Sequence, residues 1–483
     1  MSSIPSSHYL AGGWAKLVYY TLGSLHDFAY FGYITVQPLI FNSVLKKLAP
    51  FERYSFEITV FVISTHLFWQ VLLETPTGAY ADSRGRMRAV RDHFLIRVAC
   101  MSLLLLAIFL SLGSQQSYVP WLVLGCLFLI EFGMAAAEAL LSGSFDSWLV
   151  DTLAASGQKD EAGETFAKAA TLFNIAILLA MPTFLYLLVL GGDEAAYFVT
   201  GIAAVVFAIG ALVAQASRRE VYRIGIEWTA RSNATIKTTW QDGLNYLWAD
   251  RMVWWTTVLK AAPFAAWVVI SWFWPLLVKY TPGGQSAIQD TPGTRNAMLL
   301  LAIALALSRI AGSVASYLAQ RLTDPLKGLI AGTVFNLLIA LSAGLSLFYV
   351  DRSLLDTLLN DVMREESSPL LLPALIFGVS IMLAKGSEEV VKVLNQVFLA
   401  HYIRSDTVRA TVISFTGAVM NLMGFILINI GLIITWQQPP QNKAPYLLIF
   451  VTVSGIMLAL VAYRLLRGAM VRRVSTPAAG VAD

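Results

Sequence analysis

Ionisable side chains stand inside long apolar stretches of this sequence, where charge is costly. His26 and Asp27 fall near the middle of the first stretch, and Glu131 and Glu138 lie seven residues apart in the fourth. A carboxyl group or imidazole removed from water can take up and release a proton in response to its surroundings. These four residues are therefore predicted to couple proton movement to the protein, with His26 as a relay.

A second set of charged side chains lies in the second half of the chain. Lys260 occurs in an apolar stretch that also contains several tryptophans, and the stretch 370–395 holds two lysines and two glutamates. Mixed charge in apolar surroundings could bind a charged organic solute. The residues with a predicted solute-binding role are Lys260, Lys385, Glu388, Glu389 and Trp267.

Structural interpretations of the same residues stay open. The pairs that are four residues apart and could neutralise each other within one helix are Lys385–Glu389 and Glu388–Lys392. His26 beside Asp27 could form a bond that only packs a helix, and Glu138 could face water. Arg97 and Arg309 occur in other apolar stretches, and we expect structural ion pairs for both.

The apolar stretches that carry these residues determine the fold class. Of the 483 residues 57% are hydrophobic and only 13% are charged, against about 25% charged in soluble proteins. Each stretch is long enough to cross about 30 Å of hydrocarbon as a helix. The twelve predicted transmembrane helices lie near 16–40, 57–79, 93–114, 119–142, 166–190, 195–215, 254–279, 298–319, 328–350, 370–395, 408–435 and 445–464. A charge in mid-bilayer costs roughly 2.5 to 3.5 kcal/mol, so the charged residues need a partner, a wet cavity or a function.

Two repeated halves are predicted, because one long polar connection separates six helices from six more. The predicted parts are an N-terminal bundle (1–217), a cytoplasmic amphipathic linker (218–252), a C-terminal bundle (253–467) and a cytoplasmic tail (468–483). Lysine and arginine concentrate in the loops on the side of the termini, so we expect both termini in the cytoplasm. The net charge of +4 is explained by this orientation, and no nucleic-acid partner is inferred from it.

The connection between the second and third predicted helices carries a specific pattern. It reads Glu74-Thr-Pro76-Thr-Gly78-Ala-Tyr-Ala-Asp82-Ser-Arg84-Gly85-Arg86-Met-Arg88. This resembles the signature loop of the major facilitator superfamily, which acts there as a cytoplasmic latch. The resemblance implies gating roles for Gly78, Asp82, Arg84 and Arg86. Ser83 and Met87 replace residues that are usually basic in that loop, which would weaken the latch.

Two further stretches resemble bacterial members of the same superfamily. One runs over 141–153, Leu-Ser-Gly-Ser-Phe-Asp-Ser-Trp-Leu-Val-Asp-Thr-Leu, and the other begins at Arg409, Arg-Ala-Thr-Val-Ile-Ser-Phe. Together the three cover both halves of the chain. The resemblance implies an all-α fold of two six-helix bundles. It also implies a central cavity lined by the first, fourth, seventh and tenth helices, which hold almost all of the charges described above.

The function that this resemblance implies is secondary transport by a monomer in the bacterial inner membrane. We expect alternating access for a small charged or amphiphilic solute, driven by protons. An uncoupled facilitator, a lipid-moving protein and a non-transporting sensor of the same fold remain alternatives. The sequence has no phosphate-binding glycine loop, His-x-x-x-His pair or elbow serine, so we expect no enzymatic activity, metal or cofactor.

Overall fold

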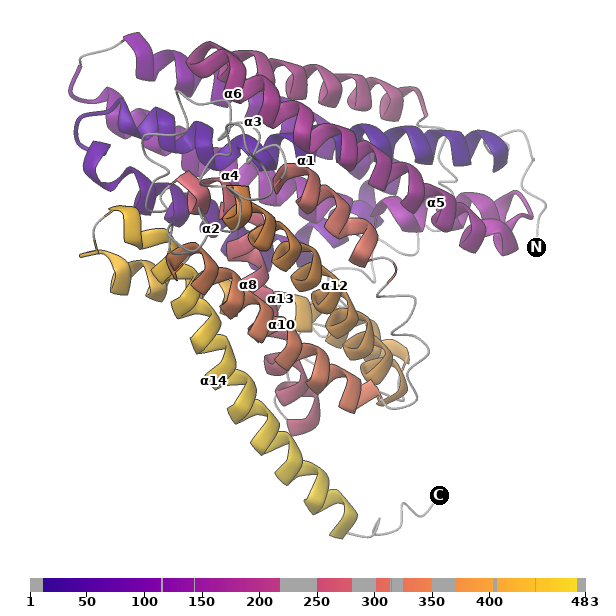
Figure 1. The fold of residues 1–483 in the computed structure, drawn as a ribbon. Coiled ribbons are helices and arrows are strands. Elements are labelled where there is room, and N and C mark those ends of the chain that lie inside the picture. Colours follow the sequence, from indigo (N-terminus) through magenta and orange to yellow (C-terminus); the bar gives the residue numbers. More distant parts are fainter. Residues whose placement is uncertain are drawn as a thin grey trace, which may run out of the picture. The chain divides into compact units, whose positions relative to one another are not determined.

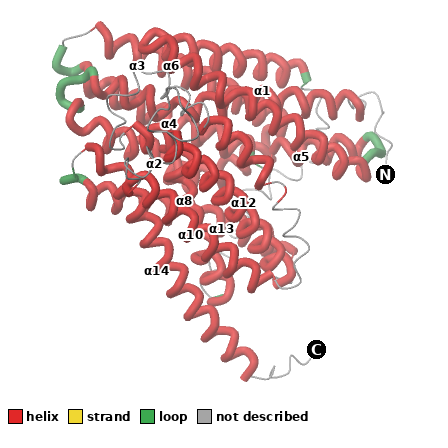
Figure 2. The backbone as a smooth tube through the Cα atoms, in the orientation of Figure 1, coloured by secondary structure: helices red, strands yellow, loops and turns green. Residues whose placement is uncertain are grey.

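The computed structural model describes most of the chain. The described residues are 12–113, 116–142, 144–217, 250–279, 301–312, 314, 325–349, 371–402, 406–438 and 440–475. Within these ranges every regular element is a helix, as Figure 2 shows. Most of the predicted linker, residues 218–249, and the tail beyond residue 475 lie outside the described residues.

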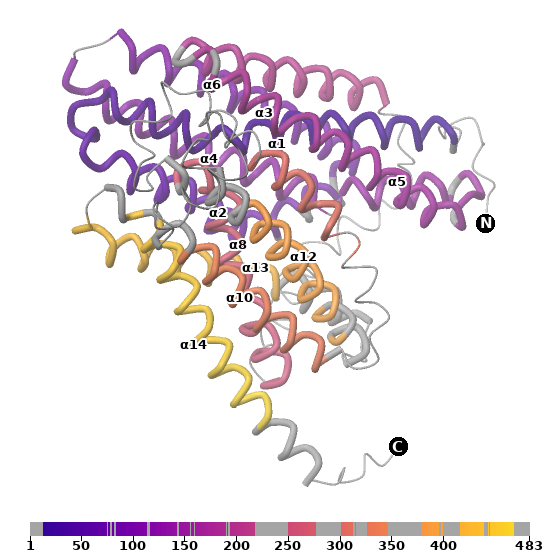
Figure 3. Tube along the Cα trace, in the orientation of Figure 1, coloured from indigo at the N-terminus to yellow at the C-terminus, as the bar shows by residue number. Residues whose placement is uncertain are grey.

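The first of two compact units is Met1–Thr235. Its α-helices are α1 (Gly12–Lys46), α2 (Ser55–Arg84), α3 (Arg86–Gly113), α4 (Val119–Leu141), α5 (Ser144–Ala155) and α6 (Ala162–Ala216). The helix α1 packs along α6, and α4 packs against α2 and α3 (Figures 1 and 3). Apolar segments become helices in lipid because every backbone N–H and C=O group must find its partner within the protein.

The second unit is Ile236–Asp483. Its described helices are α8 (Arg251–Lys279), Leu301–Gly312, α10 (Pro325–Tyr349), α12 (Leu371–Tyr402), α13 (Asp406–Thr435) and α14 (Pro440–Ser475). Contacts join α8 to α10, α12, α13 and α14. The most apolar part of α8 is 83% buried, against 28% for that of α13. Side chains of α8 therefore face protein far more than those of α13 do.

Ten of the described helical segments are long and apolar enough to cross a membrane. They match all predicted helices except the eighth and the tenth. At the position of the eighth the described residues include the apolar helix Leu301–Gly312, and at that of the tenth lies α12. The fifth and sixth correspond to Ala162–Val189 and Glu194–Ala216, which both belong to α6. The positions of the helices thus agree with the hydropathy pattern.

Close packing of α1 against α6 depends on glycine. A Cβ atom added to Gly32 would lie 2.6 Å from the Cδ2 atom of Phe184, whose own side chain is fully buried. A Cβ atom added to Gly23, nine residues earlier on α1, would lie even closer to the ring of Phe173. Small residues of this kind let two helix backbones approach in a membrane.

Gly32→Ala is therefore expected to lower the thermal stability of the purified protein. Forcing a methyl group into a filled site typically costs about 1 to 3 kcal/mol, and the buried Phe184 ring has little room to move. The matched control is Gly201→Ala in α6, where an added Cβ would meet nothing within 4 Å. Thermal denaturation in detergent measures both variants, and an equal loss of stability in the two would contradict the packing argument.

Candidate functional site

Glu131 of α4 is the centre of a first polar group in the N-terminal unit. Only 1% of the residue is exposed. The Nε2 atom of Gln37 in α1 donates a hydrogen bond to its Oε1 atom, and the Nδ1 atom of His66 in α2 lies 3.3 Å from its Oε2 atom. Among the described residues no lysine or arginine forms an ion pair with this carboxyl group. Its direct partners are an amide and an imidazole, and the permanent cation Arg97 acts on it only through space.

A second polar group in the same unit is built around Arg97 of α3, which is fully buried. Its Nη2 atom donates a hydrogen bond of 2.5 Å to the Oε2 atom of Glu138 in α4. Its guanidinium carbon lies 4.1 Å from the centre of the Tyr30 ring, and its Nε atom donates to the Nε2 atom of His93 at 3.3 Å. The structural ion pair expected for Arg97 is confirmed, and its partner is Glu138.

His26 of α1 extends this second group to Asp27. Its Nδ1 atom lies 2.8 Å from the Oδ1 atom of Asp27, and its Nε2 atom lies 3.9 Å from the Oε2 atom of Glu138. The imidazole thus lies between two carboxyl groups. With Arg97 as the permanent cation, a proton on His26 would balance the second of the two carboxylates.

The partners of these residues were missing from the sequence interpretation. Glu131 and Glu138 share one helix, but they belong to two groups with different partners. His66 contacts the first, and His93 contacts the second. Both histidines occur in predicted transmembrane helices, so the signal that identified His26 was also available for them. The N-terminal polar residues therefore involve the second and third helices as well as the first and fourth.

The loop with the predicted gating residues joins α2 to α3. Gly85 separates the two helices with a φ of 110°, a backbone conformation that favours glycine. Arg84 ends α2 and is exposed. The surroundings of Gly78 and the Asp82 side chain, both in α2, lie outside the described residues.

Arg86 at the start of α3 is bound within the N-terminal unit. Its Nη1 atom donates a hydrogen bond of 2.6 Å to the Oδ2 atom of Asp151 in α5. The same short helix is fixed to α1, because the hydroxyl of Tyr19 donates to Asp146 at 2.6 Å. The stretch over 141–153 that resembles the superfamily therefore includes most of a helix that joins the loop to α1.

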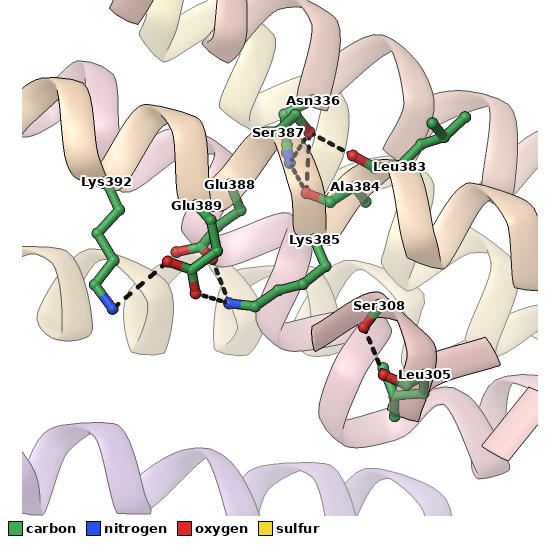
Figure 4. A network of polar contacts seen from close by, with 10 residues as sticks. All are labelled: Leu305, Ser308, Asn336, Leu383, Ala384, Lys385, Ser387, Glu388, Glu389 and Lys392. Atoms are coloured by element: carbon green, nitrogen blue, oxygen red, sulfur yellow. Dashed lines mark hydrogen bonds and ion pairs between the residues drawn. The ribbon is translucent and has the colours of Figure 1, made fainter. Parts of the chain in front are cut away.

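Lys385 of α12 is the centre of the polar group in the C-terminal unit, shown in Figure 4. Its Nζ atom lies 2.7 Å from the Oε2 atom of Glu388 and 2.5 Å from the Oε1 atom of Glu389. The Nζ atom of Lys392 lies 3.8 Å from Glu389. The predicted Lys385–Glu389 pair is confirmed. The Glu388–Lys392 pair, the other alternative, does not form, because the Glu388 carboxylate binds Lys385 one helical turn earlier.

Another side of α12 is fixed to α10. The Nδ2 atom of Asn336 donates to the backbone oxygen of Ala384 at 2.7 Å and to the Oγ atom of Ser387 at 2.9 Å (Figure 4). These bonds are buried and restrict rotation of α12 about its axis. They therefore help to determine where the charged side chains of α12 point.

Two predicted residues of α8 lie near the charged side of α12. The Nζ atom of Lys385 lies 5.2 Å from the centre of the Trp267 ring, a cation–π contact. Trp267 is 5% exposed and Lys260 is 7% exposed, and Lys260 interacts electrostatically with Glu388 and Glu389. The bundle thus brings together all five residues with a predicted solute-binding role. For Arg309 an electrostatic interaction with Glu389 is present, while its expected ion pair stays a prediction.

Comparison with solved structures identifies the fold. The nucleoside transporter NupG aligns with a TM-score of 0.62 at 14% identity, over 93% of this chain and 98% of that one. An auto-inhibited peptide transporter of the POT family gives 0.62 at 14% identity, over 94% and 96%. A bacterial homologue of the iron transporter ferroportin, in its inward-facing state, gives 0.60 at 11% identity, over 94% and 98%.

At these identities the likeness concerns the fold alone. The predicted all-α membrane fold is confirmed, because the chain aligns over 93% and 94% of its length with transporters that have the fold of the major facilitator superfamily, and twelve helices in two bundles are consistent with this likeness. No protein-family model matches the sequence, and no curated protein matches it.

Proposed function

We propose that this protein is a secondary active transporter that moves a small charged or amphiphilic organic solute by alternating access, with protons as the driving ion. The observation that carries the proposal is Glu131, a buried carboxyl group whose described partners are an amide and an imidazole. An ionisable side chain inside a membrane bundle is a functional-site hypothesis by default, and no lysine or arginine touches this carboxyl group in the described part of the chain. It can load a proton in one state of the protein and release it in another.

The proposed proton-coupling residues are Asp27, Glu131, His26 and Glu138. Glu131 comes first because Glu138 is already paired with Arg97. In the second group a proton would reside on His26 or on the carboxyl group of Asp27, which is its bonded neighbour. Both groups lie in the N-terminal unit, so we assign proton coupling to that half.

Solute recognition is assigned to the C-terminal half. The residues proposed for it are Lys260, Lys385, Glu388, Glu389 and Trp267, which gather on α8 and α12. A residue set with both signs of charge suits a charged or zwitterionic solute. We further propose that Gly78, Asp82, Arg84 and Arg86 control the cytoplasmic latch, with both termini on that side of a bacterial inner membrane and the protein acting as a monomer.

The test is solute-driven proton movement in proteoliposomes. The purified protein is reconstituted with a pH-sensitive dye inside the vesicles, and organic acids, amines, dipeptides, siderophores and cationic drugs are added outside in turn. At least one class is expected to change the internal pH, relative to protein-free vesicles, because solute and protons cross together.

Two outcomes would contradict the proposal. Solute flux that ignores an imposed pH gradient would identify an uncoupled facilitator or a lipid-moving protein. Solute binding without any flux would identify a sensor with the fold of a transporter. A thermal-shift screen with the same compounds separates these two cases, since it detects binding independently of transport.

A further inference from the structure

Lys260 is a buried lysine without a bonded partner in the described part of the chain. It lies in α8, whose most apolar part is 83% buried, and 7% of the residue is exposed. Neither a hydrogen bond nor an ion pair within 4 Å reaches its ammonium group from the described residues. Its nearest charges act on it only through space, and they are Glu388, Glu389 and Lys392.

The carboxylates near Lys260 are already engaged by other lysines. Lys385 binds both Glu388 and Glu389. Glu389 has Lys392 as a second ion-pair partner. Three ammonium groups and the Arg309 guanidinium thus act on two carboxylates, and among the three lysines the one without direct contact is Lys260. A buried charge that lacks a partner costs free energy, so such a charge persists where a partner arrives from outside.

We infer that Lys260 binds the carboxylate of the solute, and that the solute is an organic acid or zwitterion with a single carboxylate at this position. This rests on the proposed function of solute transport and specifies its substrate. One carboxylate gives the Lys260 ammonium group the direct partner that it lacks among the described residues. A second negative charge would meet Glu388 and Glu389, which repel it.

Lys385 has a different role from Lys260 in the proposed solute site. Its ammonium group is occupied by two carboxylates and by the face of Trp267 at 5.2 Å. It holds Glu388 and Glu389 away from Lys260, and this keeps the Lys260 ammonium group available. Lys385 and Trp267 are therefore positioning residues, whereas Lys260 touches the solute.

The experiment compares carboxylates with their uncharged amides as ligands of the purified, full-length protein. Acetate, lactate and benzoate are tested against acetamide, lactamide and benzamide, by thermal shift and by calorimetric titration. The carboxylates are expected to raise the Tm of the wild type, and the amides are expected to leave it unchanged. Lys260→Gln is expected to weaken carboxylate binding about 30-fold or more, the usual loss when one member of a buried charge pair is removed.

Two control variants accompany this comparison. Lys260→Arg keeps the positive charge and is expected to keep the preference for carboxylates. Lys168→Gln removes a lysine whose side chain is 63% exposed on α6, and it is expected to bind as the wild type does. Equal shifts by carboxylates and amides, or no carboxylate that shifts the wild type more than Lys260→Gln, would overturn the inference.

A measurement without ligand separates binding from a structural role. If Lys260 stabilised the bundle through an ion pair, Lys260→Gln would melt at a lower temperature than the wild type. We expect an equal or higher Tm, because the substitution removes a buried charge that has no bonded partner. A clearly lower Tm would also overturn the inference.

Failure of this inference can be told apart from failure of the proposed function. If carboxylates drive proton flux equally in the wild type and in Lys260→Gln, transport stands and the role of Lys260 falls. If carboxylates bind through Lys260 but drive no flux, the binding site stands and the transport proposal falls.

Discussion

Glu131→Gln is expected to abolish solute-driven proton flux in proteoliposomes, down to the level of protein-free vesicles. Glutamine has nearly the shape of a protonated glutamate and can still bond to Gln37 and His66, but it cannot release a proton. A carrier fixed in this form should still exchange labelled for unlabelled solute at equal concentrations, because exchange requires no net proton movement. Measurement of both rates on one preparation therefore separates lost coupling from lost folding.

The control for this prediction is Glu164→Gln. The side chain of Glu164 is 67% exposed on α6 and pairs with Lys168 one helical turn away, so the variant removes the same charge from an exposed position. Its proton flux should equal that of the wild type. If coupled flux survived in Glu131→Gln, the prediction would be wrong and the coupling role would be reassigned to Asp27 and His26. Asp27→Asn would then be expected to abolish the coupled flux.

The positions of the transmembrane helices could be predicted from the sequence, because the hydrocarbon core of a membrane allows the backbone few conformations other than the helix. A run of apolar residues must form a helix in lipid, whatever its neighbours are. The charged side chains of α12 lie against protein partners, as the contacts of Lys385 with Glu388 and Trp267 illustrate.

The partners of the charged residues could be predicted only in part. The position of Arg97 in an apolar helix predicted an ion pair, but the choice of Glu138 depends on how α3 packs against α4. Spacing within one helix was also insufficient to predict which lysine each glutamate of α12 binds. Glu388 can reach a lysine in either direction, and in the structure it binds Lys385, as Glu389 does. Hydropathy gives the cost of a buried charge, whereas the packing of helices determines what offsets it.

The largest effect on stability is expected from Glu138→Leu. This change leaves the Arg97 guanidinium, which is fully buried, without its carboxylate. Removal of one member of a buried ion pair typically costs about 3 to 5 kcal/mol. Arg97→Met should cost less, because the Glu138 side chain is 30% exposed and water can solvate the carboxylate that remains.

The double variant Arg97→Met/Glu138→Leu removes both charges at once. It tests whether the bundle needs the ion pair, or needs only that neither charge is left without its partner. Apolar groups that fill the same volume can replace a buried ion pair at little cost, so the double variant should be more stable than Glu138→Leu alone. Thermal denaturation in detergent, carried out on both single variants and the double variant, gives the coupling between the two residues. If the losses of the single variants simply added, Arg97 and Glu138 would act independently, and the charge balance proposed for His26 and Asp27 beside them would lose its basis.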